Sequence, residues 1–142
     1  MWVKRICFSP APPITSPFLL VFHKIGRSRF KDDLAAYYDS RLGNVVDTPR
    51  RVAGSRSAWA QYSILLDNRD HVAAALKEKG VPTAIYYPLP MHLQSAYREF
   101  GDGIGSMPVS ESLSKRILSL PMHPYMDEAT RARICDELAA IL

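Results

Sequence analysis

Apolar side chains recur with the period of an α-helix in the first half of the chain. Phe30, Leu34, Tyr37 and Tyr38 are spaced three and four residues apart, which predicts a helix from about residue 30. Gly43 stands where such a helix would end, and we expect it to form a left-handed C-cap.

The segment 69–79 carries the clearest local helix signal. Asn68 can cap its first turn, Gly80 can end it, and Pro82 prevents its continuation. The apolar stripe that would be buried consists of Val72, Ala75 and Leu76.

Two further helices are expected in the last third of the chain. The first covers 109–120, where Val109, Leu113, Ile117 and Leu120 are apolar. The second is opened by Asp127 and Glu128. Its apolar positions are Ile134, Cys135, Leu138, Ile141 and Leu142.

Two strands are predicted around the helix at 69–79. Alternate positions of 58–66 are apolar, namely Ala58, Ala60, Tyr62, Ile64 and Leu66. Trp59 and Leu65 make the other face partly apolar too, which favours a strand inside a sheet. Residues 81–86 form the second strand. We therefore expect an α/β (α+β) fold, a small sheet backed by helices.

Residues 1–28 differ in kind from the rest. Prolines at positions 10, 12, 13 and 17 should break any helix, and the apolar run 18–22 is too short to span a bilayer. A transit peptide is the alternative to a flexible tail, but no uninterrupted apolar core is present. We expect 1–28 to be a basic, proline-rich, flexible segment and 29–142 to be one domain.

The chain has 142 residues, of which 47% are hydrophobic and 23% are charged. This composition is typical of a protein with one globular core and no membrane span. Cys7 and Cys135 are far apart and lack a metal-ligand spacing, so a disulfide framework, a zinc site and a secreted setting are disfavoured. We expect a cytoplasmic protein with no metal.

The net charge of +4 raises the question of nucleic-acid binding. Residues 1–31 contain six basic and no acidic side chains, whereas 57–142 contain eight basic and ten acidic ones. Because a nucleic-acid surface needs cations clustered on the fold itself, this partner is disfavoured.

Three motifs stand in register along the chain: Ser57-Ala-Trp-Ala-Gln-Tyr62, the run from Tyr86-Tyr87-Pro88 to His92-Leu93-Gln94, and Leu118-Ser-Leu-Pro-Met-His-Pro-Tyr125. Together they resemble the C-terminal small domain of the DegT/DnrJ/StrS aminotransferases. The resemblance covers about residues 29–142. It implies a truncated fold type I aminotransferase domain.

The resemblance also implies chemistry and partners. Members of this family use pyridoxal phosphate to transfer an amino group from glutamate or glutamine to a keto sugar, often one carried on a nucleoside diphosphate. The motifs look most like members acting on UDP-linked 3-keto sugar acids in cell-surface polysaccharide synthesis, with antibiotic-sugar synthesis as the other role implied. A homo-oligomer is expected.

Transamination requires a lysine that forms a Schiff base with the cofactor. Lys24 lacks the acidic, glycine-rich turn that follows this lysine in the family, and Lys77, Lys79 and Lys115 fall on predicted helix surfaces. We therefore expect no catalytic or cofactor-binding residue in this chain, no bound cofactor, and no activity alone. The alternative is a small sugar-nucleotide-binding or dimerisation module without catalysis.

The proline-stiffened loop that starts at Tyr86 carries the candidate substrate contacts. By resemblance these are Tyr86, Tyr87, His92 and Gln94, whose phenol, imidazole and amide groups can bond sugar hydroxyls or phosphate. Packing at a strand end is the alternative for the two tyrosines, and a satisfied, half-buried imidazole is the alternative for His92.

Three other polar residues are given structural interpretations. His123 belongs to the segment that resembles a return to the sheet in the family. Arg51 and Arg56 could meet a diphosphate, but a solvated connection is favoured.

Overall fold

The computed structural model describes the backbone of residues 17–142 and the side chains of residues 29–142. The predictions made for residues 1–16 lie outside the described residues. Helix α1 spans Pro17–Leu42, so it begins well before the expected start near residue 30. The expectation that proline 17 breaks any helix is wrong, because a first-turn proline lacks an amide hydrogen that would have no helical partner there.

The end of α1 differs from the expected left-handed cap. Gly43 is not among the residues with positive φ. A side chain is excluded there for another reason, since a Cβ on Gly43 would lie 2.7 Å from the carbonyl oxygen of Asp39. A glycine is therefore required at position 43 because the backbone of Asp39 leaves no room for a side chain.

The sheet consists of β1 (Tyr62–Leu65) and β2 (Ile117–Leu120), which pair antiparallel with Ile64 opposite Leu118. Among the described residues the sheet has only these two strands, and the outer side of β1 carries a single isolated bridge, between Leu65 and Asp47, so the expectation of a strand inside a sheet is met at one residue only. The predicted helix over 109–120 is wrong at its end. Because the apolar positions of 117–120 suit a buried strand as well as a helix, only pairing with β1 decides between them.

The predicted strand 81–86 is reduced to one bridge. Ala84 and Ser119 exchange backbone hydrogen bonds of 3.1 and 2.8 Å, and no other residue of 81–86 pairs in this way among the described residues. Pro82 has no amide hydrogen to donate to a ladder, which limits the pairing.

The predicted strand 58–66 is also shorter at its start. Trp59 adopts a left-handed backbone with φ of 45° and is buried, whereas Ala58 and Ala60 are exposed. The buried side chain at the start of this segment is therefore Trp59, and not Ala58 and Ala60 as expected. A left-handed non-glycine residue interrupts the alternation that a strand requires.

Helix α2 (Arg69–Glu78) confirms the predicted segment and buries Val72 and Leu76. Asn68 stands at the N-cap, but its side chain makes no capping hydrogen bond, so that detail was wrong. Gly80 has φ of 71°, and its C-terminal role is confirmed.

Helix α4 (Glu128–Ile141) begins as expected. The carboxylate of Asp127 accepts a hydrogen bond from the amide of Thr130 at 2.8 Å, and Ile134, Cys135 and Leu138 are buried. The Thr130 hydrogen bonds lower the pKa of Asp127. Burial raises the pKa of the Cys135 thiol to about 11.

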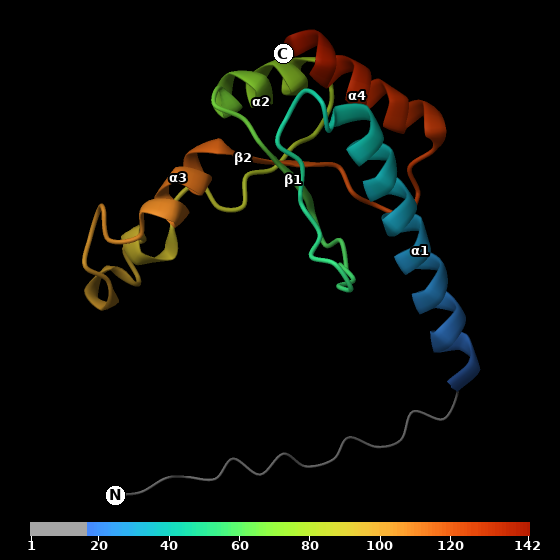
Figure 1. The fold of residues 1–142 in the computed structure, drawn as a ribbon, viewed down its shortest axis with the longest axis horizontal. Helices are drawn as coiled ribbons and strands as arrows, with labels where there is room; N and C mark the ends of the chain where they lie inside the picture. Colours follow the sequence, from blue (N-terminus) through green and yellow to red (C-terminus); the bar gives the residue numbers. More distant parts are fainter. Residues whose placement is uncertain (1–16) are drawn as a thin grey trace, which may run out of the picture.

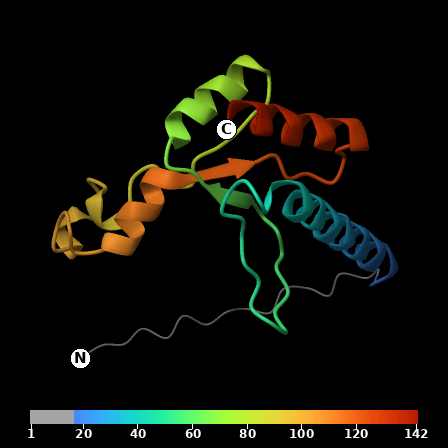
Figure 2. The same ribbon diagram turned by 45° about the horizontal axis from the view of Figure 1, so that its top comes forward.

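Helices α1, α2 and α4 gather on one side of the sheet and enclose the core (Figure 1). On the other flank, residues 87–116 project away from the helices, as both views show (Figure 2). We call this segment the α3 arm. It contains the short helices η1 (Met91–Leu93) and η2 (Arg98–Phe100), followed by α3 (Pro108–Arg116).

The mixed architecture confirms the predicted small sheet backed by helices. Among the described residues, none of the helices combines the length and the apolar character needed to cross a membrane.

Candidate functional site

The two adjacent tyrosines lie where the chain leaves the sheet. Ala84 still pairs with β2, and the next residues turn into the α3 arm. The rings of Tyr86 and Tyr87 meet edge to face with centroids 5.8 Å apart, and they remain 43% and 67% exposed. The two tyrosines thus follow a single bridge at Ala84 and not the end of a strand, and both residues remain exposed.

A cavity of about 470 Å³ lies between the turn at 86–92 and helix α3. We call it the Tyr87 cavity. Its walls are mostly apolar, with a few hydroxyl groups and one imidazole. They are formed by Tyr86, Tyr87, Leu89, Pro90, Met91, His92, Met107, Ser110, Leu113, Ser114 and Ile117. Its size and apolar lining are typical of small-molecule sites.

Glu111 ties the walls of this cavity together. Its carboxylate lies 3.1 Å from Nε2 of His92 and accepts hydrogen bonds from the amides of Gly105 (2.8 Å) and Met107 (3.2 Å). Partial desolvation alone would raise the pKa of Glu111, but these hydrogen bonds hold it below its usual value. The carboxylate also lies in the first turn of α3, where the helix dipole favours negative charge.

The structure brings three of the four predicted residues to the cavity and leaves one outside. Tyr86, Tyr87 and His92 line it. The His92 side chain is only 11% exposed and faces Glu111, as in the satisfied, half-buried alternative. Gln94 is not among the lining residues; its amide donates to the carbonyl of Leu89 at 3.0 Å and braces the turn.

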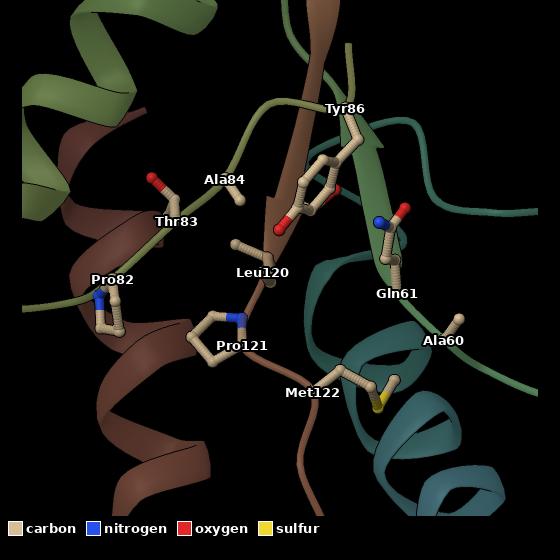
Figure 3. A pocket seen from close by; sticks show the side chains of 10 residues that line it. Ala60, Gln61, Pro82, Thr83, Ala84, Tyr86, Leu120, Pro121 and Met122 are labelled. Atoms are coloured by element: carbon tan, nitrogen blue, oxygen red, sulfur yellow. The ribbon is translucent and has the colours of Figure 1, made fainter.

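A second, more polar cavity of about 310 Å³ lies on the other side of Tyr86. We call it the Gln61 cavity. Figure 3 shows the Tyr86 ring reaching over it with the hydroxyl directed toward Leu120, while Gln61 stands on the neighbouring wall. The remaining walls come from Ala60, Pro82, Thr83, Ala84, Ser119, Pro121 and Met122. Tyr86 is therefore a wall shared by both cavities.

Arg69, which the sequence did not single out, anchors α3. Its side chain is buried, and its Nη1 donates to the carbonyls of Ser114 and Ile117, each at 3.3 Å. A cation at the carbonyl end of a helix is stabilising. Arg69 thereby fixes the junction of α3 and β2 that forms the base of the Tyr87 cavity.

Glu111 and Arg69 were both missed because their partners are formed by the fold. Pro108 followed by an acid in the first turn was a usable signal for Glu111, since this pattern is typical of helix starts. For Arg69 no local signal existed, because its two acceptors lie more than forty residues away.

The arginines before β1 face α1. Arg51 lies 3.6 Å from Asp39, and Arg56 lies 3.1 Å from Asp32. Nε1 of Trp59 donates to Asp32 as well, at 3.0 Å. Neither arginine lines the two cavities, so the structure gives both a role in holding the 47–60 loop to α1.

His123 has a local role. Its Nδ1 accepts a hydrogen bond from the amide of Tyr125 at 3.3 Å. This contact shapes the turn between β2 and α4, as the structural interpretation of the segment expected.

The lysine that pyridoxal phosphate requires does not line either cavity. Neither wall contains a lysine, and Lys77 faces a different hollow beside α2. The side chain of Lys24 lies outside the described residues. The described residues of the two cavities therefore do not fit the cofactor, because nothing there can form the Schiff base. Among the described residues, no cluster of His, Cys, Asp and Glu is suited to hold a metal ion.

The chain is similar in sequence to enzymes that act on nucleotide sugars. It is 40% identical over 109 residues to UDP-2-acetamido-2-deoxy-3-oxo-D-glucuronate aminotransferase of Pseudomonas aeruginosa, covering 76% of this chain and 30% of the relative. It is 30% identical over 105 residues to dTDP-3-amino-3,4,6-trideoxy-alpha-D-glucose transaminase of Streptomyces venezuelae, covering 72% and 28%.

The chain is also similar to solved structures of aminotransferases. A DegT DnrJ EryC1 StrS aminotransferase from Brucella abortus superposes with a TM-score of 0.75 at 47% identity, covering 80% of this chain and 31% of that one. DesV of S. venezuelae, in complex with a ketimine intermediate, gives a TM-score of 0.81 at 27% identity, covering 84% and 33%. These neighbours confirm the aminotransferase domain fold expected from the motifs.

The chain spans about 30% of the length of these relatives. The family model of the DegT/DnrJ/EryC1/StrS aminotransferases matches residues 25–139. Because this match covers most of the chain, the protein belongs to the DegT/DnrJ/EryC1/StrS aminotransferase family.

Proposed function

We propose that this chain is the substrate-side domain of a sugar-nucleotide aminotransferase, and that amino transfer needs a Schiff-base lysine that the two cavities do not provide. The observation that carries the proposal is the pair of cavities on either side of Tyr86, in a domain whose relatives act on UDP- and dTDP-sugars. The reaction would move an amino group from glutamate to a keto sugar.

The residues of the site suit the binding of a sugar nucleotide. Tyr86 and Tyr87 present phenol rings that can stack on a flat or apolar face and hydroxyls that can hydrogen-bond. His92 holds the turn through Glu111, and Gln94 holds it through Leu89. We assign Tyr86 and Tyr87 to substrate contact and the other two residues to positioning that contact.

Pyridoxal phosphate, when bound, supplies the electron sink for amino transfer. The family depends on this cofactor, but the chain described here offers it no lysine at either cavity. The contribution of this chain is to bind and orient the sugar nucleotide. A UDP-linked substrate in cell-surface polysaccharide or antibiotic-sugar synthesis, a homo-oligomer and a cytoplasmic setting all belong to the same proposal.

Two measurements on the full chain test the proposal. After incubation with pyridoxal phosphate we expect no absorption band of a lysine-bound cofactor and no amino transfer from glutamate. Titration with UDP-N-acetylglucosamine, a stable stand-in for the keto sugar, should give saturable heat and a rise in Tm. Tyr86→Ala should remove most of this binding, whereas Tyr125→Ala, a change at a residue 79% exposed outside both cavities, should not.

Either of two outcomes contradicts the proposal. A stable cofactor band with turnover would show that the chain is complete as an enzyme. The absence of any binding to UDP- or dTDP-sugars at millimolar concentration would remove the substrate-side role.

A binding module without catalysis is the second candidate. It is supported by the rings of Tyr86 and Tyr87, which are 43% and 67% exposed and can be reached by a ligand in this chain. Addition of a lysine-bearing domain of a relative distinguishes the two candidates, because amino transfer should be restored for a domain of an enzyme and not for an independent module.

A further inference from the structure

One edge of the sheet carries backbone groups that have no partner in the described part of the chain. Ala84 exchanges both of its backbone hydrogen bonds with Ser119 of β2, beside which the segment runs (Figure 3). Because the backbone groups of an extended segment point to alternate sides, those of Thr83 and Ile85 point away from β2. Among the described residues, neither Thr83 nor Ile85 forms a backbone hydrogen bond. We call residues 83–85 the free edge.

The proline next to this segment does not block the free edge. Pro82 lies two residues before Ala84, so its missing amide hydrogen falls on the side that faces β2. The outward side therefore offers a donor and an acceptor at both Thr83 and Ile85. Both residues are β-branched and half-buried, which favours an extended backbone. An unpaired edge of this kind is a template for another extended segment.

A hollow of about 460 Å³ lies between the free edge and helix α2. On the α2 side it is lined by Ala73 and Ala74, whose side chains are small, and by Lys77. None of these three residues lines either cavity beside Tyr86. The hollow leaves room next to the free edge for the side chains of a second strand.

The segment that fits this edge is the same edge of a second copy of the chain. A two-fold axis at Ala84 would place Thr83 of one copy opposite Ile85 of the other, so that each donor faces an acceptor. The second copy presents this segment already extended, so that little conformational entropy is lost on pairing. Electrostatic repulsion is small as well, because residues 57–142 contain eight basic and ten acidic side chains.

From these observations we infer that the chain forms a two-fold dimer through the free edge, in which the two sheets join antiparallel. This inference rests on the homo-oligomer of the proposed function and adds an interface to it. Since a short edge buries little surface, the dimer is weak and its fraction rises with protein concentration.

Two measurements on the full chain test the dimer. Sedimentation equilibrium from micromolar to millimolar concentration should show a monomer–dimer equilibrium. Hydrogen exchange over the same range should show increasing protection of the Thr83 and Ile85 amides. The Ala84 amide is the internal control, because its hydrogen bond to Ser119 is already present in the monomer.

Thr83→Pro removes the outward amide hydrogen from each copy. Two intermolecular hydrogen bonds are then lost, so the dissociation constant of the dimer should rise roughly five- to a hundredfold. Thr83→Val is the matched control, since it keeps both the amide hydrogen and a β-branched side chain. Its dissociation constant should stay unchanged.

Ala74→Lys tests the hollow and leaves the backbone of the edge intact. Ala74 is exposed on α2, so the fold should tolerate the change. A second lysine beside Lys77 in each copy should weaken the dimer roughly tenfold or more, because like charges face each other across the interface. High salt should restore part of this loss. Ala36→Lys, at an exposed position of α1, is the matched control.

Two outcomes would overturn the inference. The first is a monomer at millimolar concentration. The second is a dimer that Ala74→Lys leaves unchanged and whose Thr83 and Ile85 amides show no dependence on concentration, since another surface would then form it. Both readouts apply even if Thr83→Pro fails to fold, which circular dichroism and Tm would show.

Titration of Ala74→Lys with UDP-N-acetylglucosamine separates the interface from the proposed function, because Ala74 lines neither cavity. Wild-type affinity in the weakened dimer would support both. If the dimer responds as expected but no sugar nucleotide binds, the interface stands and the substrate-side role is wrong. If the sugar nucleotide binds and no dimer forms, the interface is wrong and the substrate-side role stands.

Discussion

The helix-backed sheet and the α3 arm are stabilised in different ways. Ile64 and Leu118, paired across the sheet, have no exposed surface. In contrast, nine of the fourteen exposed large apolar side chains belong to the α3 arm, where Phe100 and Ile104 are 80% and 86% exposed. The arm is ordered mainly by the polar contacts of Glu111, His92 and Arg69.

This contrast separates stability from function in the molecule. Burial of apolar surface stabilises the sheet and its three helices whether or not a ligand is present. The Tyr87 cavity, however, depends on a few hydrogen bonds between the 86–92 turn, the 103–107 loop and α3. We therefore expect substitutions in the core to change folding and substitutions in the arm to change the site.

The largest predicted difference is between replacing an isoleucine by alanine in the core and making the same replacement in the α3 arm. Ile64→Ala should lower the free energy of unfolding by about 2–5 kcal/mol, because it leaves a cavity in a packed core. Ile104→Ala should change it by less than about 0.5 kcal/mol, since this side chain is already in water. Urea titration followed by circular dichroism measures both, and equal losses would contradict the division.

A smaller loss of stability is expected when a buried hydroxyl group is removed. Tyr62 donates to the carboxylate of Asp39 at 2.6 Å, and burial raises the pKa of its phenol far above the usual value. Tyr62→Phe should cost about 1.5–3 kcal/mol, the range for a hydrogen bond to a charged group. Tyr87→Phe should cost less than about 0.5 kcal/mol, because that ring is exposed. Comparable urea midpoints for the two variants would count against this ranking.

The smallest predicted effect is a loss of local stability in the α3 arm at low pH. Since the folded-state pKa of Glu111 is lowered, the contribution of its carboxylate is complete above its unfolded pKa of about 4.3 and is lost as pH falls through the lower folded value. Hydrogen exchange of the Gly105 and Met107 amides, corrected for intrinsic rates, should therefore lose protection in acid.

Glu111→Gln should weaken that protection near neutral pH and remove most of its acid dependence. Asp127→Asn is the control, because its partner is the Thr130 amide of α4. If Asp127→Asn alters the Gly105 amide as strongly as Glu111→Gln does, the arm is not an independent unit and the contrast with the core fails.

The helices with their own start and stop signals could be predicted from the sequence. Helix α2 ends at Glu78, just before the left-handed Gly80, and α4 follows Asp127, whose carboxylate caps it. The motif around Tyr86 also indicated residues that the fold brings together. Three of its four predicted residues, Tyr86, Tyr87 and His92, line one cavity.

The second cavity could not be predicted, because its residues meet only in the fold. Gln61 and Leu120 are neighbours of Tyr86 through the pairing of β1 with β2 and of Ala84 with Ser119. The same pairing turns 117–120 into a strand. The spacing of the apolar residues in 117–120 was compatible with a helix, because such spacing carries no information about contacts with distant residues.

The sequence by itself determined the helices α2 and α4, the family and the position of the tyrosine turn, because caps, stripes and motifs are properties of neighbouring residues. The tertiary structure decided the extent of the strands, the left-handed turn at Trp59 and the two cavities that share Tyr86. Those features arise from hydrogen bonds and packing between segments far apart in the chain, whose energy no stretch of neighbouring residues contains.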